Sequence, residues 1–228
     1  MMIARTIMVS FVLVCGMTLG ALMWKLLTLL ARDRDTAQGT MTLEQEEERE
    51  ELIRENRTAR PMIEEDFLTM NPYSRPGEPL ETVKNIFVHY TANQGTSARQ
   101  NRSYFENLGT SGETSASAHF VIGYEGEIIQ CLPLEEIGYA VKSRNYDSVS
   151  IECCYLSENG SFTDATYSSL VKLTAWLLNE YDLTPADVLR HYDVGGKKCP
   201  LYFVEDEGAW EEFKKDVKEY ILRGKMSG

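Results

Sequence analysis

Residues 85–90 read NIFVHY, and residues 148–155 read SVSIECCY. Both runs are rich in β-branched and aromatic residues, and such short runs are typical of strands rather than helices. Each run also carries a polar residue among its apolar neighbours, His89 near the end of the first and Glu152 inside the second. The sequence therefore predicts two strands that present functional groups.

The rest of the folded part alternates between strand-like and helix-like segments. Further strands are predicted at residues 119–124, 127–132 and 188–191. The first two flank Glu125-Gly126, a turn signal that predicts a hairpin. Helices are predicted at residues 97–108, 163–181 and 207–222, the second with Asp164 as a capping residue near its start. This order predicts an α/β domain with a single mixed β-sheet flanked by helices.

The first 31 residues have the composition of a membrane segment. No charged residue occurs between Ile7 and Trp24, and apolar residues continue after Lys25. A run of this length can cross the hydrocarbon core as a helix. No convincing small-x-small cleavage site follows it, so an uncleaved anchor is favoured over a signal peptide. We therefore expect one N-terminal transmembrane helix at about residues 7–29, in an anchor formed by residues 1–31.

An acidic segment follows the predicted anchor. Residues 43–60 are dense in Glu and Arg and show no sustained heptad, which indicates a solvated helix or spacer rather than a coiled coil. Prolines then punctuate the chain before the strand at residue 85. We expect an acidic, Glu-rich stalk or linker at residues 32–79 and the folded domain at residues 80–228.

The overall composition excludes several classes of protein. The chain has 228 residues, is 43% hydrophobic and 10% aromatic, and carries a net charge of −12. The apolar content is sufficient for a core, so the chain is not disordered as a whole. The acidic balance argues against nucleic-acid binding and against docking on anionic lipid. Five cysteines do not indicate a dense disulfide framework, although a bridge from Cys131 to Cys153 or Cys154 stays open.

Three residues have the chemistry of a metal site. His89 and His191 each lie near the end of a predicted strand, and Cys199 follows eight residues after His191. Two imidazoles and one thiolate form a three-ligand zinc set, which leaves a fourth position open for water. The alternative interpretation is that each histidine is satisfied by local hydrogen bonds and that Cys199 is a small buried apolar residue.

Four blocks of sequence resemble the zinc-dependent N-acetylmuramoyl-L-alanine amidases. The blocks are IFVHYTA (86–92), SAHFVI (117–122), SVSIECCY (148–155) and RHYDVGGKKCP (190–200). This family includes phage amidase lysins and is related in fold to the peptidoglycan recognition proteins. The resemblance covers about residues 80–222. It implies that His89, His191 and Cys199 are zinc ligands and that Glu152 and Lys197 are catalytic.

The residue types are consistent with the roles that the resemblance implies, but each residue also has an alternative interpretation. A carboxylate in an apolar strand is costly unless it is paired or functional, so Glu152 is either catalytic or a buried ion-pair partner. Lys197 is either catalytic or a surface lysine, with Lys198 as the one that faces solvent. Some members carry a tyrosine where this chain has Ala118, so the acid–base work falls to Glu152. His119 is interpreted as a sheet or supporting residue, and His89, His119 and His191 form the runner-up metal set.

The resemblance implies a hydrolase of bacterial or phage origin that cleaves the amide between N-acetylmuramic acid and L-alanine in peptidoglycan. We expect Zn²⁺ as cofactor, peptidoglycan as substrate, membrane attachment through the N-terminal helix, no nucleic acid, and a monomer. One alternative is a peptidoglycan-binding module without turnover, and another is a tethered interaction protein. The presence of Cys199 beside both histidines favours the enzyme, because related binding modules have lost the thiolate.

The orientation across the membrane is ambiguous. Arg5 precedes the predicted span, whereas Lys25, Arg32 and Arg34 follow it, which by the positive-inside rule places the domain in the cytoplasm. Peptidoglycan lies outside the membrane, so the implied function places the domain toward the cell wall. We expect a single-pass protein of the cell membrane that faces the wall, with a cytoplasmic domain acting on wall fragments as the alternative.

Overall fold

The computed structural model describes residues 45, 47–48, 51 and 57–224. The chain divides into two units, residues 1–48 and residues 49–228. The predicted anchor and the predicted transmembrane helix at about residues 7–29 lie outside the described residues. Among the residues that are described, no helix is both long enough and apolar enough to cross a bilayer.

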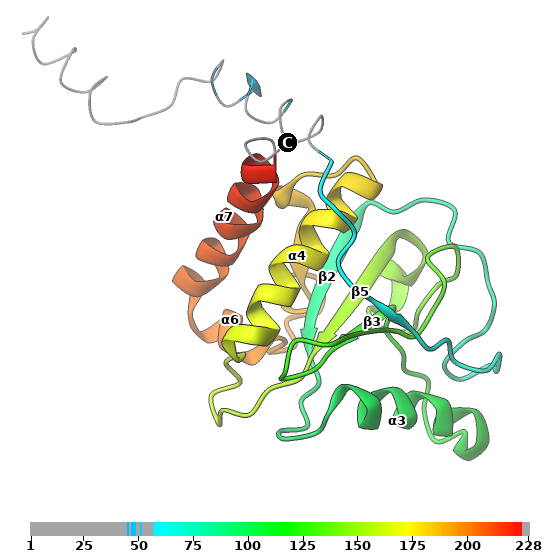
Figure 1. Ribbon diagram of the computed structural model, residues 1–228. Helices are drawn as coiled ribbons and strands as arrows, with labels where there is room; N and C mark the ends of the chain where they lie inside the picture. The colour runs from blue at the N-terminus through cyan, green and yellow to red at the C-terminus, as the bar shows by residue number, and fades with distance from the viewer. Residues whose placement is uncertain (1–44, 46, 49–50, 52–56, 225–228) are drawn as a thin grey trace, which may run out of the picture. The chain divides into compact units, whose positions relative to one another are not determined.

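The second unit is built around one six-stranded sheet (Figure 1). Its strands are β1 (Glu64–Glu65), β2 (Asn85–Tyr90), β3 (Phe120–Ile122), β4 (Ile128–Gln130), β5 (Ser148–Cys153) and β6 (Val188–Arg190). Their order across the sheet is β1-β4-β3-β5-β2-β6. The β3–β4 pair is the predicted hairpin and is antiparallel, whereas the other neighbouring pairs are parallel. The prediction of a single mixed sheet is confirmed.

Helices cover both faces of this sheet. The helices are α3 (Ala98–Ser111), α4 (Asp164–Glu180), α5 (Tyr192–Gly195), α6 (Leu201–Glu205) and α7 (Glu207–Gly224), with 3-10 turns η1 (Lys142–Asp147) and η2 (Pro185–Asp187). The helices α4, α6 and α7 lie on one face and α3 lies on the other (Figure 1). Side chains of the first three pack in the larger core, and those of α3 pack in a smaller core. The three long helices expected from the sequence are therefore present.

The capping residue of α4 differs from the expectation. Thr163 has extended backbone angles, and its hydroxyl accepts a hydrogen bond from the backbone N–H of Thr166. Asp164 is already the first helical residue, where its negative charge faces the positive end of the helix dipole. The expectation that Asp164 caps the helix was wrong by one residue.

The alternation of side chains along the central strands determines which residues share a face. Ile86 and Val88 of β2 join the larger core, as do Val149, Ile151 and Cys153 of β5. Successive side chains of a strand point to opposite faces. His89 and Glu152 therefore lie on the other face of the sheet, away from α4 and α7.

Residues 57–79, here called the strap segment, pack against the domain although the sequence assigned them to the linker. β1 pairs in parallel with β4 at the edge of the sheet. The pairing continues as the N–H groups of Asp66 and Leu68 donate to the carbonyls of Gln130 and Cys131. Leu68 is only 1% exposed and belongs to the smaller core. The packed region thus begins before residue 80.

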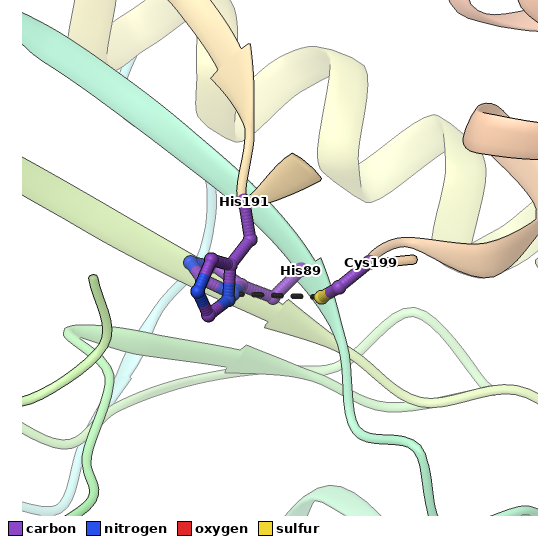
Figure 2. A group of neighbouring side chains, drawn as sticks. All are labelled: His89, His191 and Cys199. Atoms are coloured by element: carbon purple, nitrogen blue, oxygen red, sulfur yellow. Dashed lines mark hydrogen bonds between the residues drawn. The ribbon is translucent and has the colours of Figure 1, made fainter. Parts of the chain in front are cut away.

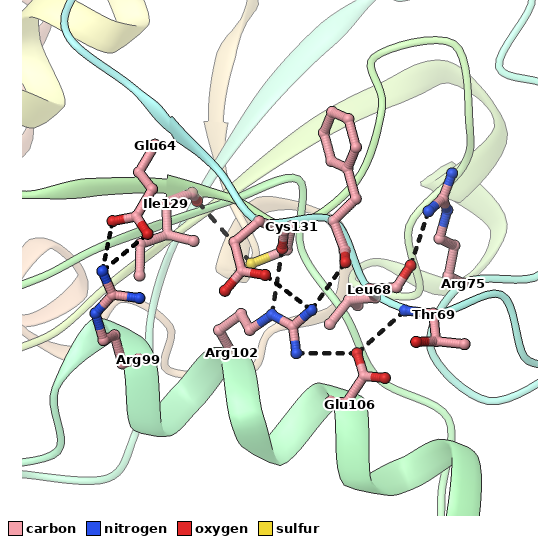
Figure 3. Close-up of polar contacts among 11 residues, drawn as sticks. Glu64, Leu68, Thr69, Arg75, Arg99, Arg102, Glu106, Ile129 and Cys131 are labelled. Atoms are coloured by element: carbon pink, nitrogen blue, oxygen red, sulfur yellow. Dashed lines mark hydrogen bonds and ion pairs between the residues drawn. The ribbon is translucent and has the colours of Figure 1, made fainter.

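Ion pairs and hydrogen bonds connect the strap segment to α3 (Figure 3). The Arg102 guanidinium donates to the backbone carbonyl of Phe67 and forms an ion pair with Glu106. Glu106 in turn accepts a hydrogen bond from the backbone N–H of Thr69. Arg99 pairs with Glu64 of β1 at 2.7 Å. These contacts join the edge strand to the helix that covers the same face as His89.

The cysteines of the described region are free thiols. Cys131, Cys153, Cys154 and Cys199 are all buried and unpaired. The bridge from Cys131 that the sequence left open is therefore absent from the structure.

Candidate metal centre

The topology brings the two candidate histidines to one edge of the sheet. β2 and β6 are parallel neighbours, so their carboxyl ends lie side by side. His89 is near the end of β2, and His191 directly follows β6. Cys199 returns to the same place after α5, where its carbonyl accepts a hydrogen bond from the backbone N–H of Tyr192.

The three candidate ligands converge (Figure 2). The Sγ atom of Cys199 lies 3.6 Å from Nδ1 of His89. The imidazole rings of His89 and His191 have centroids 4.9 Å apart and meet edge to face. One ligand atom from each of the three residues lies within 4.8 Å of the others. The sequence-predicted ligand set is thus assembled in space from three separate segments.

The donor atoms of this cluster fit a metal ion. His89 is 1% exposed and Cys199 is 2% exposed. Among the described residues, the buried Nε2 of His89 and Nδ1 of His191 have no hydrogen-bond partner. Buried polar atoms are rarely left without a partner. Two nitrogens and one sulfur are a donor set that suits zinc and leaves room for a further ligand.

Lowered pKa values keep both imidazoles in the neutral form, which is the form that binds metal. Burial lowers the pKa of His89 well below its usual value, and the positive charges of His191 and Lys197 lower it further. The pKa of His191 is also lowered, mainly by burial and then by Lys197. Neutral imidazoles are the form that binds metal. Burial raises the pKa of the Cys199 thiol to about 12, so a cation is needed to hold it as the thiolate.

Glu152 faces the cluster from the neighbouring strand. It is the register partner of His89, and its Oε1 lies 4.0 Å from Nδ1 of that histidine. Its Oε2 is buried and has no hydrogen-bond partner among the described residues. Burial raises the pKa of this carboxyl to about 8, while the charge of Lys197 lowers it. A divalent cation at the cluster would lower it further and favour the carboxylate.

The two lysines of the loop before Cys199 differ in their surroundings. Lys197 is exposed, and its charge acts on His89, Glu152, His191 and Cys199. Lys198 instead forms an ion pair with Glu205 at 2.8 Å. Of the two, Lys197 is therefore the cation whose field reaches the cluster.

Comparison with known proteins agrees with this geometry. The sequence pattern of the N-acetylmuramoyl-L-alanine amidase family matches residues 79–201, which is more than half of the chain. The chain belongs to this family. The match ends shortly after Cys199 and leaves out nearly all of the strap segment, so that segment lies outside the shared amidase pattern.

Individual relatives and a solved structure support the assignment. The amidase BlyA of Bacillus subtilis (strain 168) is 33% identical over 183 residues, which cover 71% of this chain and 47% of BlyA. A probable amidase of Bacillus licheniformis is 33% identical over 175 residues, covering 71% and 49%. The chain thus spans about half the length of these relatives. The catalytic domain of XlyA superposes with a TM-score of 0.59 at 29% identity, covering 69% of this chain and 99% of that domain.

The third histidine of this amidase-family chain is engaged elsewhere. His119 is buried, with Nε2 lying 2.9 Å from the carbonyl oxygen of Glu136. Its Nδ1 accepts a hydrogen bond from the backbone N–H of Ser150 at 3.2 Å. Because both nitrogens have backbone partners, the runner-up set of His89, His119 and His191 is not assembled. Ala118 beside it is fully buried and offers no hydroxyl.

Sequence reasoning gave no role to two residues of the motif that carries His191. Arg190 and Asp193 form an ion pair at 2.8 Å on either side of this histidine. The sequence does show opposite charges three positions apart, which is compatible with an ion pair. Such a pair usually lies on the surface and contributes little to stability. Here the Arg190 side chain is only 8% exposed, whereas that of Asp193 is 24% exposed, so the pair ties a buried guanidinium to a carboxylate nearer the surface.

Proposed function

We propose that this chain is a zinc-dependent amidase that hydrolyses the bond between N-acetylmuramic acid and L-alanine in peptidoglycan. The observation that carries the proposal is the convergence of His89, His191 and Cys199 beside Glu152. The family assignment and the names of the relatives give the bond that is cut. The ligands and Glu152 all come from one chain, so a monomer suffices.

His89, His191 and Cys199 would hold the zinc ion. When bound, zinc supplies a Lewis acid for the amide carbonyl and lowers the pKa of water at the site. The unpartnered nitrogens of the two histidines are the support for this assignment. The free thiol of Cys199 supplies the third ligand when it ionises.

Glu152 would act as the general base and then as the general acid. Its carboxylate accepts the proton of the attacking water and passes it to the leaving amine of L-alanine. Its place opposite His89, with one oxygen free of protein partners, leaves it available for proton transfer. Lys197 would supply positive charge to the oxyanion that develops on the carbonyl oxygen.

The chain would act at the outer side of the cell membrane. The uncharged run from Ile7 to Trp24 supports a single-pass anchor, and the location of peptidoglycan supports a domain that faces the wall. Protease treatment of intact protoplasts tests the orientation. Digestion of the domain is expected, whereas protection until the membrane is broken would place it in the cytoplasm.

Labelling of new amino groups in digested peptidoglycan tests the bond that is cut. The full-length chain should make L-alanine the new amino-terminal residue of the stem peptide. New reducing sugar ends, or a different amino-terminal residue, would show another hydrolase. Tight binding to peptidoglycan without any new end would show a binding module instead.

A further inference from the structure

Arg190, the last residue of β6, is a buried cation with an unusually complete set of partners. The residue is 6% exposed. Its Nη2 donates to Oδ1 of Asp193 at 2.8 Å, and its Nη1 donates to the carbonyl of Phe203 at 2.8 Å and to Glu207 at 2.6 Å. The guanidinium also lies over the rings of Tyr192 and Trp210, at 5.5 Å and 5.3 Å from their centroids.

These contacts close the turn that carries His191. The Oδ2 atom of Asp193 accepts a hydrogen bond from the backbone N–H of Arg190 at 2.7 Å. Asp193 therefore binds both the backbone and the side chain of Arg190, with His191 between them. A planar guanidinium on a carboxylate fixes direction as well as distance. The turn that projects the His191 imidazole is thus held at both of its ends.

The same guanidinium reaches the segment that follows Cys199. Phe203, whose carbonyl it binds, is in α6, which begins at Leu201 directly after Cys199-Pro200. The backbone N–H of Tyr192 donates to the carbonyl of Cys199 at 3.1 Å, a second link between the two segments. One side chain therefore connects the His191 turn to the helix next to Cys199.

We propose that Arg190 is a positioning residue that holds His191 and Cys199 at the separation that binds zinc. The inference rests on the proposed function, because it takes these two residues as ligands. Groups that orient metal ligands typically change metal affinity by about 10- to 100-fold when they are removed. Lysine keeps the charge of Arg190 but lacks the planar fork, so it cannot hold Asp193 and Phe203 together.

The test is a zinc titration of the full-length chain against a chelator of known affinity, with the variant Arg190→Lys. We expect its zinc affinity to fall by about 10- to 100-fold. Arg75→Lys is the matched control, because Arg75 also binds a carboxylate twice, a backbone carbonyl and an aromatic ring. That arginine lies in the strap segment and should leave zinc affinity unchanged.

Unfolding of both metal-free variants separates positioning from general stability. Arg75→Lys shows how much zinc affinity is lost when a partly buried arginine network elsewhere is weakened. For a similar loss of stability, Arg190→Lys should lose more zinc affinity than Arg75→Lys. Wild-type zinc affinity in Arg190→Lys, or an equal fall in both variants, would overturn the proposal. If Arg190→Lys fails to fold, Asp193→Asn tests the same ion pair. This variant is expected to fold, because the Asp193 side chain is 24% exposed and asparagine has nearly the same size. Asp193→Asn should bind zinc more weakly, and unchanged affinity would overturn the proposal.

The two proposals fail in different ways. A wild-type chain that binds no zinc would refute the zinc site and the role of Arg190 together. A wild-type chain that binds zinc tightly, with no loss in either variant of the Arg190–Asp193 pair, would refute only the positioning role.

Discussion

His89 and Glu152 are direct register partners on β2 and β5, and Nδ1 of the imidazole lies 4.0 Å from Oε1 of the carboxylate. Both side chains project from the face of the sheet opposite α4 and α7. The two strands are parallel and central in the sheet, with β3 on the far side of β5 and β6 on the far side of β2. A rigid pairing of this kind can keep the proposed general base at a constant distance from a proposed metal ligand.

Glu152→Gln should abolish most of the turnover while the protein still binds zinc. Glutamine keeps the size of the side chain but cannot accept a proton, so a fall of about 10²- to 10⁴-fold in kcat is expected. Initial rates on solubilised peptidoglycan, with zinc content measured on the same samples, check this. Glu106→Gln on α3 is the control and should retain full turnover. Unchanged kcat in Glu152→Gln would remove this residue from the chemistry.

Cys199→Ala should lose zinc and activity together. The substitution removes one of the three proposed ligands and leaves the two histidines, which would hold the metal more weakly. Cys153→Ala is the matched control, because Cys153 is also a buried free thiol but packs in the larger core. It should lose a modest amount of stability and keep its zinc. Full metal content in Cys199→Ala, measured by elemental analysis after dialysis, would contradict the ligand assignment.

The strap segment should contribute to the stability of the domain. Leu68→Ala removes a side chain that is 1% exposed, and a loss of about 2–5 kcal/mol in the free energy of unfolding is expected. Met62→Ala is the control from the same segment, since Met62 is 93% exposed and should change stability little. Urea unfolding of both variants gives the comparison. Equal stability of the two would show that the strap segment does not hold the domain together.

His119 should make the folded state less stable in mild acid. Burial lowers its pKa from 6.5 to about 4 in the folded protein, whereas the unfolded chain has the ordinary value. As the pH falls below 6.5 the unfolded state takes up the proton first, so stability present at neutral pH is lost as the pH falls toward 4. At pH 5 the loss from this group is about 2 kcal/mol.

The matched variant His119→Gln isolates this effect. It should be less stable than the wild type at pH 7 because the hydrogen bond to Ser150 is lost. The difference between the two proteins should shrink as the pH is lowered to 5, as measured by urea unfolding of metal-free samples. A difference that does not change with pH would show that His119 is not the group responsible.

Local pattern was enough to predict the long elements, and tertiary context decided the others. β2 and β5 were predicted because β-branched and aromatic residues fill them. β1 was missed because its two residues are Glu64 and Glu65, which have no strand preference and pair only because the edge of β4 lies beside them. α5 and α6 are too short to show a helical period.

In the candidate site, too, some residues could be predicted from local pattern and others only from tertiary packing. Residue type and spacing, together with the family resemblance, indicated the three candidate ligands. Alternation along β5 grouped Glu152 with Ser150 and Cys154 on one face, and the resemblance implied that Glu152 faces the metal. The role of Arg190 could not be predicted from the sequence, because an Arg–Asp pair constrains the backbone strongly only where it is buried, and burial is set by the tertiary structure. In the sequence the pair looks like a surface contact, and only the contacts of the Arg190 guanidinium with Trp210 and Phe203 show that the arginine is buried.

The decisive measurement is mass spectrometry of peptidoglycan digested by the full-length chain, with zinc measured on the same sample. We expect glycan strands with free lactyl carboxyl groups, intact stem peptides that begin with L-alanine, and about one zinc ion per chain. Undigested peptidoglycan in the presence of bound zinc, or products cut at any other bond, would contradict it.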